Sequence, residues 1–225
     1  MRLTIVAATG GIGRQLLQQA VAAGHDVTAV ARNPRRLAGT LPTGVRVVTA
    51  DLADPDPSAL EAAVQGADAV LSGLGPRSAS DVGVTARGTE AVVRAMQATG
   101  TRRIVVVSAA PIGTVPSPGR PKPPRHDPGD GFFMRHLFSH VAKTAFRRHY
   151  ADLALMEDLL RGSGLDWTVV RPPRLTDKPL SGRYRTAYGQ NVRGGWLVSR
   201  ADVAHLMLGV LAQPETIKQV VGVAN

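Results

Sequence analysis

The sequence predicts an α/β protein built on a doubly wound parallel sheet. Short apolar runs alternate along the chain with longer segments in which apolar residues recur at helical spacing, which is typical of parallel strands joined by crossover helices. The apolar runs end in glycine or polar residues, and an open parallel sheet binds its ligands at those ends. We expect residues 1–225 to form a single domain with a small C-terminal substrate-binding region.

The first expected unit is a strand, a glycine turn and a helix. Residues 3–7 are apolar, the turn Thr9-Gly10-Gly11 follows, and apolar residues recur at helical spacing from Ile12 onward. Glycines in such a turn let the backbone approach a pyrophosphate, and the free N–H groups at the start of the helix receive its charge. Ala7 stands at the usual place of the first glycine, where an alanine costs little if its φ stays negative.

The second expected strand, residues 26–32, ends in Arg32. It closes a βαβ unit of about thirty residues, whose tip lies beside the adenosine ribose of a bound dinucleotide. A carboxylate at the tip would bind the ribose 2′-OH, whereas a guanidinium pairs bidentately with a 2′-phosphate. Arg35 and Arg36 follow Arg32. We therefore predict a phosphate-binding fork and NADP(H) as the cofactor, with solvated loop arginines as the alternative.

The alternation continues to the end of the chain. Further strands are expected at residues 45–49, 67–71, 103–107 and 166–171, and helices near 57–64, 82–99 and 132–162. A basic, proline-rich stretch at about 111–131 predicts an irregular loop. After Pro173, a basic stretch with Tyr184 and Tyr188 is expected to form a substrate cap, and we expect Trp196 in the core. Ser199 and Asp202 are spaced like a capping box at a helix start.

The composition restricts the classes of function. The absence of cysteine excludes disulfides, thiolate metal sites and a cysteine nucleophile. The first strand begins at the second residue and no apolar run is long enough to span a membrane, so we expect a cytoplasmic protein. The net charge of +10 is spread over the chain without a nucleic-acid-binding signature, which argues against nucleic acid as a partner. His136 and His140 lack a third ligand, and we expect no metal.

Several motifs together carry a resemblance to a known family. They are the Ala8–Gly13 turn, Arg32-Asn33-Pro34, Asp51-Leu52, Gly75-Pro76-Arg77, residues 164–173 and Ser199–Ala204. On these motifs the chain resembles the atypical short-chain dehydrogenase/reductases, and most of all the NAD(P)H-binding branch that contains biliverdin IXβ and flavin reductases. It is more distantly similar to NmrA-like redox sensors. The resemblance covers almost the whole chain except about residues 111–150, and it implies a Rossmann-type fold.

The resemblance also implies a place for each part of the cofactor. The turn residues Ala8, Thr9, Gly10, Gly11, Ile12 and Gly13 would line the pyrophosphate, and Arg32 with Arg36 would hold the 2′-phosphate. Asp51 and Leu52 would flank adenine, unless Asp51 is a helix cap. Gly73, Leu74, Gly75 and Arg77 would face the ribose and phosphates, unless Arg77 is an exposed loop charge. Ser108, Ala109 and Ala110, with Pro172, Pro173 and Arg174, would surround the nicotinamide.

The catalytic pair of typical short-chain dehydrogenases is missing. Those enzymes use a tyrosine whose pKa is lowered by a lysine four residues later. At that spacing Tyr150 is followed by Ala154, and His149 by Leu153. Flavin and biliverdin reductases manage without the pair, because hydride passes directly to a stacked acceptor. Ala109 and Arg174 replace a serine and a histidine of those enzymes, which leaves the substrate open.

Ser108, Arg174 and Tyr150 are the candidate catalytic residues. Ser108 would offer a hydroxyl near the nicotinamide or merely end its strand, and Tyr150 would be a proton donor. Arg174 would pair with an anionic acceptor, or with Asp177 or solvent. The leading hypothesis is an NADPH-dependent oxidoreductase that reduces a flavin, quinone or similar conjugated acceptor by direct hydride transfer. The alternatives are a non-enzymatic NADP(H) sensor and a specialised biosynthetic reductase or isomerase, and we expect a monomer or homodimer.

Overall fold

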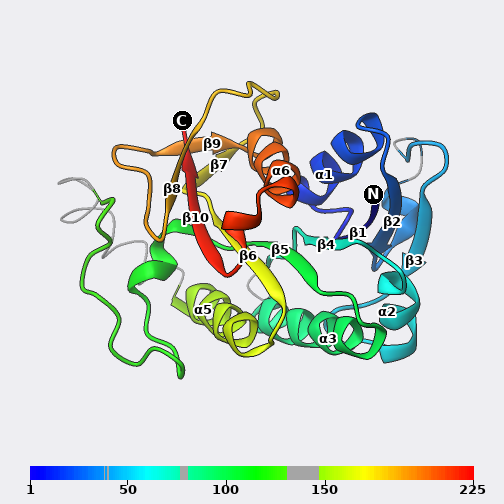
Figure 1. Cartoon of the computed structure of the whole chain (residues 1–225), viewed down its shortest axis with the longest axis horizontal. Helices are drawn as coiled ribbons and strands as arrows, with labels where there is room; N and C mark the ends of the chain where they lie inside the picture. The colour runs from blue at the N-terminus through cyan, green and yellow to red at the C-terminus, as the bar shows by residue number, and fades with distance from the viewer. Residues whose placement is uncertain (38, 40, 77–80, 131–146) are drawn as a thin grey trace.

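An eight-stranded sheet forms the centre of the computed structural model (Figure 1). In chain order its strands are β1 (Arg2–Val6), β2 (Asp26–Ala31), β3 (Arg46–Thr49), β4 (Ala69–Ser72), β5 (Arg103–Val107), β6 (Asp166–Arg171), β8 (Arg185–Tyr188) and β10 (Gln219–Ala224). Their order across the sheet is β3-β2-β1-β4-β5-β6-β10-β8. Neighbouring strands run parallel except β8, which is antiparallel to β10. The predicted doubly wound parallel sheet is confirmed. The structure describes residues 1–37, 39, 41–76, 81–130 and 147–225.

Helices cover both faces of the sheet (Figure 1). They are α1 (Gly11–Ala22), α2 (Pro57–Val64), α3 (Val84–Thr99), α5 (Arg147–Gly162) and α6 (Arg200–Gly209), with 3₁₀ turns η1 (Pro34–Leu37), η3 (Ala110–Thr114), η5 (Val210–Ala212) and η6 (Pro214–Thr216). Helices α1 and α6 pack together on one face, and α2, α3 and α5 form a row on the other. Each face has its own apolar cluster, one containing Leu16 and Met207, the other Met96 and Leu160. The sheet is therefore buried on both sides, as its continuously apolar strands predict.

The register of the strands aligns their carboxyl ends. Val6 of β1 lies opposite Val30 of β2 and Ser72 of β4, and Ala31 lies opposite Thr49 of β3. The residues that follow these strands consequently meet at one edge of the sheet, where ligands of open α/β sheets bind.

The C-terminal region differs in part from the prediction. Strands β7 (Arg174–Thr176) and β9 (Leu197–Ser199) form a small parallel sheet of their own, while β8 extends the main sheet. The prediction that Trp196 lies in the core is wrong, because its side chain is 41% exposed. The physical reason is a close approach of the backbone next to it: a Cβ on Gly195 would lie 2.2 Å from Cβ of Ala224. The backbone before Trp196 is thus held against Ala224, and the indole that follows it lies at the surface.

The proline-rich stretch contains no regular helix or strand between η3 and residue 130, apart from an isolated bridge between Ser117 and Arg120. The predicted helix at 132–162 is seen as α5, and its earlier part, with His136 and His140, lies outside the described residues. Within the described part of the chain, none of the helices has the length and apolar character that crossing a membrane requires.

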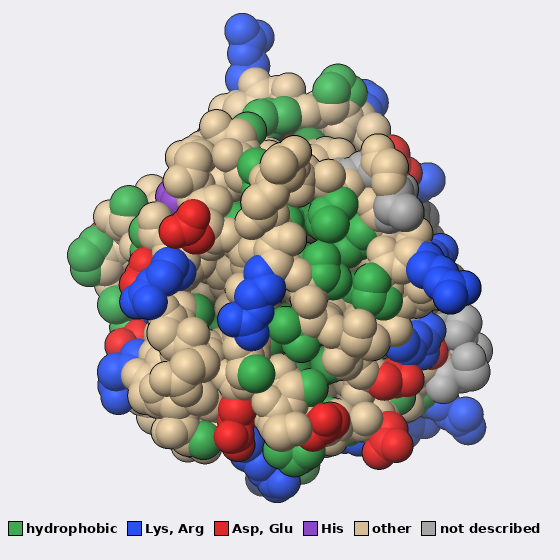
Figure 2. All heavy atoms as spheres, turned by 90° about the vertical axis from the view of Figure 1, so that its right-hand side faces the viewer, with side chains coloured by type: hydrophobic (Ala, Val, Ile, Leu, Met, Phe, Trp, Pro, Cys, Tyr) green, Lys and Arg blue, Asp and Glu red, His purple; other side chains and the backbone are tan. Residues whose placement is uncertain are grey.

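Charged side chains are dispersed on the face of the molecule that Figure 2 shows. Lysine and arginine side chains stand apart from one another there, and acidic side chains lie among them. On this face the described side chains form no continuous basic stripe of the kind that follows a nucleic-acid backbone.

Candidate functional site

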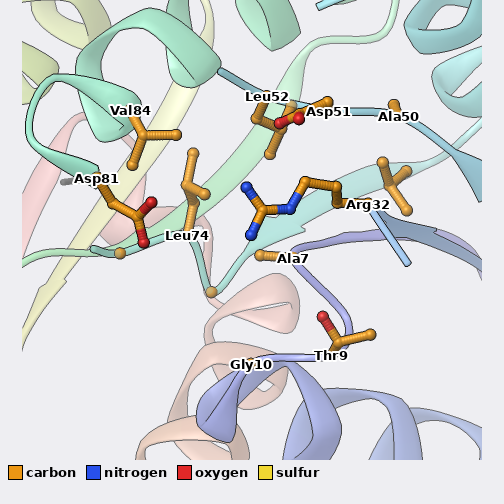
Figure 3. Close-up of a pocket in the computed structure, with 13 residues that line it drawn as sticks. Ala7, Thr9, Gly10, Arg32, Ala50, Asp51, Leu52, Leu74, Asp81 and Val84 are labelled. Atoms are coloured by element: carbon orange, nitrogen blue, oxygen red, sulfur yellow. The ribbon is translucent and has the colours of Figure 1, made fainter. Parts of the chain in front are cut away.

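A cleft opens where the carboxyl ends of β1, β2, β3 and β4 meet (Figure 3). It contains about 590 Å³ of empty space, part of it open to solvent. The predicted cofactor residues that line it are Thr9, Gly10, Arg32, Asp51, Leu52, Gly73, Leu74 and Gly75. Ala7, Val30, Ala50, Asp81 and Val84 line it as well, although the sequence reasoning did not select them. Ala7 and Ala50 directly follow β1 and β3, and Val30 is the last but one residue of β2. Val84 begins α3, and Asp81 lies three residues before it.

The turn after β1 is held by its own backbone. The Ala8 N–H donates to the carbonyl of Val30 at 3.0 Å, and the Gly10 N–H donates to the carbonyl of Ala7 at 2.8 Å. Ala7 has a φ of 59°, in the left-handed region that alanine rarely adopts. The condition under which an alanine costs little at this position, a negative φ, is therefore not met. Ala7 is the first residue of the turn that the Gly10–Ala7 hydrogen bond closes, and it adopts the left-handed conformation there.

Backbone segments touch beneath this turn. A Cβ on Gly13 would lie 2.2 Å from the carbonyl oxygen of Ala7, and one on Gly73 would lie 2.9 Å from the nitrogen of Gly13. Helix α1 starts after Gly10, whose backbone is extended and which brings no side-chain cap to the first N–H groups. Such groups, at the positive end of the helix dipole, are suited to an anion. The cradle therefore fits a pyrophosphate. Ala8 and Ile12 are buried beneath it and Gly11 is exposed at its rim.

Arg32 follows β2 and extends into the cleft toward Leu74 (Figure 3). Its guanidinium stands where a ribose of the adenosine half would lie in a doubly wound dinucleotide-binding fold. Arg36, the second predicted member of the fork, is exposed and is not part of the cleft lining. The carbonyl of Arg36 accepts a hydrogen bond from the Arg14 guanidinium at 3.1 Å. The structure thus brings Arg32, rather than Arg36, to the cleft.

Asp51 and Leu52 follow β3 and form the neighbouring wall. The Asp51 carboxylate accepts a hydrogen bond from the Ala53 N–H at 3.0 Å, which tightens the turn. The alternative reading of Asp51 as a helix cap is wrong, because Asp56 caps α2 through the N–H of Ser58. Asp81 and Val84 form the rim in front of α3, and the predicted residue Arg77 lies outside the described residues.

The two segments predicted to face the nicotinamide lie side by side. The Ser108 N–H donates to the carbonyl of Val170 at 2.8 Å, and the Ala110 N–H donates to the carbonyl of Pro172 at 2.9 Å. Ser108, Ala109 and Ala110 follow β5, and Pro172 and Pro173 follow β6, two strands further along the edge that carries the cleft. The geometry matches the direction in which a dinucleotide would extend from the cleft. These residues do not line the cleft itself.

The Ser108 hydroxyl takes part in a buried charged network. Its Oγ donates to Oε1 of Glu157 on α5 at 2.8 Å, and Nε of Arg171 donates to the same oxygen at 2.8 Å. Arg161 also pairs with this carboxylate, at 2.7 Å. Burial raises the pKa of Glu157, but the hydrogen bonds and charges of its partners outweigh burial and hold the pKa below its ordinary value. The network fixes the tips of β5 and β6 against α5 and turns the hydroxyl toward Glu157.

The other two catalytic candidates lie apart from this network. Tyr150 is partly buried on α5 against the apolar cluster of that face, and burial raises the pKa of its phenol. In a tyrosine–lysine pair the lysine lowers the pKa of the tyrosine, so the pKa of Tyr150 is shifted in the opposite direction. Arg174 is exposed at the start of β7. Asp177 instead binds Nη1 of Arg200 at 2.6 Å, so the suggested ion pair between Arg174 and Asp177 is wrong, whereas the exposure of Arg174 agrees with the alternative of contact with solvent.

Arg200 is a residue of interest that the sequence reasoning missed. It is the first residue of α6, after Ser199, whose hydroxyl caps the helix by accepting the Asp202 N–H at 2.9 Å as predicted. Its side chain covers Gly11 at the start of α1. The signal was present in the motif Ser199–Ala204, but nothing in the sequence says that this motif lies beside the glycine turn. In the described part of the chain no group of three His, Asp or Glu side chains could hold a metal ion.

The sheet, its glycine turn and the cleft define a dinucleotide-binding protein of the doubly wound class. The chain belongs to the NAD(P)H-binding family, whose model matches residues 7–214. The predicted resemblance is thereby confirmed.

Two curated relatives illustrate the range of the sequence similarity. YhfK of Bacillus subtilis, described as an uncharacterized sugar epimerase, is 26% identical over 222 residues, which are 96% of this chain and 90% of YhfK. Rv2047c, an uncharacterized protein of Mycobacterium tuberculosis, is 34% identical over 109 residues, or 48% of this chain. The chain spans only 12% of the length of that relative.

Two solved structures share the fold over the whole chain. ChuY, an anaerobillin reductase from Escherichia coli O157:H7, is 25% identical with a TM-score of 0.76, and the match covers 100% of this chain and 97% of ChuY. A short-chain dehydrogenase/reductase from Veillonella parvula in complex with NADP is 20% identical with a TM-score of 0.77, covering 100% of this chain and 94% of that one. The Rossmann-type fold predicted from the motifs is confirmed.

Proposed function

We propose that this protein is an NADPH-dependent reductase that passes hydride directly to a small conjugated acceptor such as a flavin or a quinone. The observation that carries the proposal is the position of Arg32. Its guanidinium extends into the cleft from the tip of β2, where a carboxylate would select NADH. A guanidinium there favours a 2′-phosphate, because the two groups form charge-assisted, bidentate hydrogen bonds.

The other contacts expected for the cofactor follow one another along the same edge of the sheet. Asp51 and Leu52 would flank adenine, and the cradle around Gly10 and Gly13 would hold the pyrophosphate. The nicotinamide would then reach the paired segments that follow β5 and β6. When bound, the reduced nicotinamide supplies the hydride. We treat residues 1–225 as one NAD(P)-binding domain, because strands from both ends of the chain pair in one sheet.

The chain itself would contribute positioning rather than acid–base chemistry. The Ser108 hydroxyl already donates a hydrogen bond to Glu157, and burial raises the pKa of the partly buried Tyr150 phenol. Neither group is activated for proton transfer in the way a tyrosine–lysine pair is. Holding an electrophilic, conjugated acceptor against the nicotinamide suffices for hydride transfer and is worth several orders of magnitude in rate. Arg174 is exposed at the start of β7 and would be available to pair with an anionic acceptor.

Two proteins of the same fold support the proposed function. ChuY, which shares the fold over the whole chain, is a reductase, and the Veillonella parvula protein binds NADP. The sequence differences at Ala109 and Arg174 leave the identity of the acceptor to experiment.

The test is to follow oxidation of NADPH and NADH by the purified protein with a panel of free flavins, quinones and tetrapyrroles. We expect turnover with at least one acceptor and a preference for NADPH. If NADP⁺ and NADPH bind tightly and equally, and no acceptor causes oxidation of NADPH, the proposed reductase activity is overturned. That result would favour an NADP(H) sensor. Conversion of a substrate without net consumption of NADPH would instead favour an isomerase.

A further inference from the structure

A separate pocket lies beside the small sheet of β7 and β9. It is lined by Thr176 at the end of β7, Leu197 at the start of β9, and Lys178, Gly194, Trp196 and Asn225. Its empty space is about 490 Å³, part of it open to solvent. The Asn225 N–H donates to the carbonyl of Leu197 at 3.0 Å. The pocket is therefore bordered by a strand pair that is itself held in place.

This pocket adjoins the segments expected to surround the nicotinamide. Strand β7 begins directly after Pro173, so Thr176 is three residues, or roughly 10 Å of extended chain, from that segment. Gly194 lines the pocket and also borders a narrow crevice that contains Ala110 and Pro173. A ligand in the pocket would therefore lie next to the expected position of the nicotinamide.

Two large apolar side chains are exposed in this lining. Trp196 is 41% exposed and Leu197 is 38% exposed. Val198 and its register partner Leu175 pack into the core cluster, so the other face of the strand pair, which carries Leu197, is directed away from the core. Adjacent apolar side chains exposed in a concave surface mark binding sites. An indole is in addition a flat surface on which a conjugated ring can stack.

The charges beside the pocket are positive. Lys178 is exposed and belongs to the lining. Arg174 is also exposed, and it lies opposite Leu197 in the strand pair, so both side chains are on the same face. Asp177, next to Lys178, is paired with Arg200 at 2.6 Å, and none of the described lining residues is acidic. The pocket is therefore suited to a ligand that combines an apolar ring with an anionic group.

We propose that this pocket binds the conjugated acceptor, with its ring stacked on the indole of Trp196 and an anionic group, a phosphate or a carboxylate, paired with Lys178. Trp196 then contributes to the affinity for any planar acceptor, and Lys178 favours the anionic ones. The inference rests on the proposed function, because it gives a place to the acceptor of that reaction. A second copy of the chain is the other occupant that exposed apolar surface would accept, and the experiment separates the two.

The experiment measures binding of riboflavin and flavin mononucleotide to the purified protein saturated with NADP⁺. The two flavins share the ring and differ in one phosphate. We expect Trp196→Ala to weaken the binding of both by about tenfold, the usual value of stacking on an aromatic side chain. Lys178→Gln should weaken flavin mononucleotide by about threefold, the size of an exposed ion pair, and leave riboflavin unchanged.

Matched variants outside the pocket are the controls. Leu155→Ala removes an apolar side chain that is 40% exposed on α5, and Lys122→Gln removes the same charge as Lys178→Gln. Both should bind the two flavins like the wild type. The affinity for NADPH should stay the same in every variant, because Trp196 and Lys178 do not line the cofactor cleft.

Absence of flavin binding by the wild type, wild-type flavin affinity in Trp196→Ala, or an equal loss of NADPH affinity in that variant would overturn the proposal. So would a wild-type dimer that Trp196→Ala dissociates without a change in flavin binding, since the surface would then contact a second copy. If the wild type oxidises NADPH and Trp196→Ala keeps its KM for the acceptor, the pocket is wrong and the proposed function stands. If the flavins bind as expected and no acceptor oxidises NADPH, the proposed function fails and the pocket stands.

Discussion

The side chain of Arg200 lies against Gly11, so that a Cβ on Gly11 would stand 2.6 Å from Cδ and 2.7 Å from Nε of the arginine. Arg200 begins α6 and Gly11 begins α1, and the two helices pack side by side (Figure 1). The guanidinium consequently stands beside the N–H groups that we expect to receive the pyrophosphate. Its partner Asp177 has a side chain that is 89% exposed, so a bound phosphate could replace it at little cost.

Replacing Arg200 should weaken both nicotinamide cofactors equally. We expect Arg200→Gln to lower the affinities for NADPH and NADH by the same factor, about tenfold, because the pyrophosphate is common to both and a charged hydrogen bond is worth ~1.5 kcal/mol or more. Fluorescence titration of each cofactor measures this. The control is Asp177→Asn, which frees the guanidinium and should keep or increase both affinities. Unchanged binding by Arg200→Gln would exclude a role for this residue at the pyrophosphate.

Replacing Arg32 should change the choice between cofactors. We expect Arg32→Asp to weaken NADPH binding by about tenfold to a hundredfold, the value of one or more charge-assisted hydrogen bonds, while NADH binds as well as before or better. Titration of both cofactors gives the ratio. Arg35→Asp makes the same change of charge outside the cleft lining. It is the control for the effect that a change of net charge has on cofactor binding through long-range electrostatics. A parallel loss for both cofactors in Arg32→Asp would contradict the assignment.

Ala7 stores backbone strain that a glycine would relieve. Its φ of 59° disfavours any residue with a Cβ, so we expect Ala7→Gly to stabilise the fold by about 0.5–1 kcal/mol despite the extra entropy of the unfolded chain. For a protein of this size that raises Tm by about 1–4 °C. Thermal unfolding followed by circular dichroism measures it. Ala8→Gly, next to it and without a positive φ, should lower Tm instead; equal effects at the two positions would argue against strain at Ala7.

Asp202 should make stability depend on acid pH. Burial raises the pKa of Asp202, but hydrogen bonds from Ser199, Ser181 and Gly182 outweigh burial and leave the pKa below its ordinary value. The folded state therefore holds its proton less tightly than the unfolded state, whose aspartate pKa is about 3.9. The stabilisation is complete above that pH and is lost as the pH falls through the lower pKa of the folded state.

The measurement is Tm as a function of pH for the wild type and Asp202→Asn. We expect the variant to have a lower Tm at neutral pH and a smaller loss of Tm between about pH 5 and pH 2. Asp26→Asn, at an exposed position of β2, is the matched control and should follow the wild type. Parallel curves for wild type and Asp202→Asn would show that this carboxylate contributes nothing to the acid sensitivity.

Tyr150 should be dispensable for turnover. Burial raises the pKa of its phenol, and Ala154 stands where a lysine would lower it. We expect Tyr150→Phe to change kcat by less than about threefold, compared with the hundredfold or more that general acid catalysis contributes. Steady-state kinetics with the best acceptor measure this. A loss of several hundredfold with unchanged NADPH binding would identify Tyr150 as the proton donor after all.

Local sequence patterns predicted much of the secondary structure and part of the candidate site of this protein. The strands at the start of the chain, the glycine turn and Arg32 could be placed because each depends on neighbours in sequence: apolar runs, turn residues and helical spacing. The same patterns predicted that the strand tips would lie along one edge of the sheet, because the carboxyl ends of parallel strands share an edge, although the residues that follow β5 do not line the cleft. The strands β8 and β10 were missed, and Trp196 was misplaced, because the pairing of β10 with β6 and the packing of Gly195 on Ala224 involve segments far apart in the chain.

By itself, then, the sequence determined the parallel sheet, the glycine turn after the first strand and the arginine at the tip of β2. The tertiary structure decided which side chains are already paired within the protein and which are available to a ligand. It placed Arg200 over Gly11, bound the Ser108 hydroxyl to Glu157 and left Trp196 exposed in a pocket beside β7 and β9. The physical reason is that a side chain's chemistry depends on its burial and its partners. Those are set by contacts between residues that no local pattern connects.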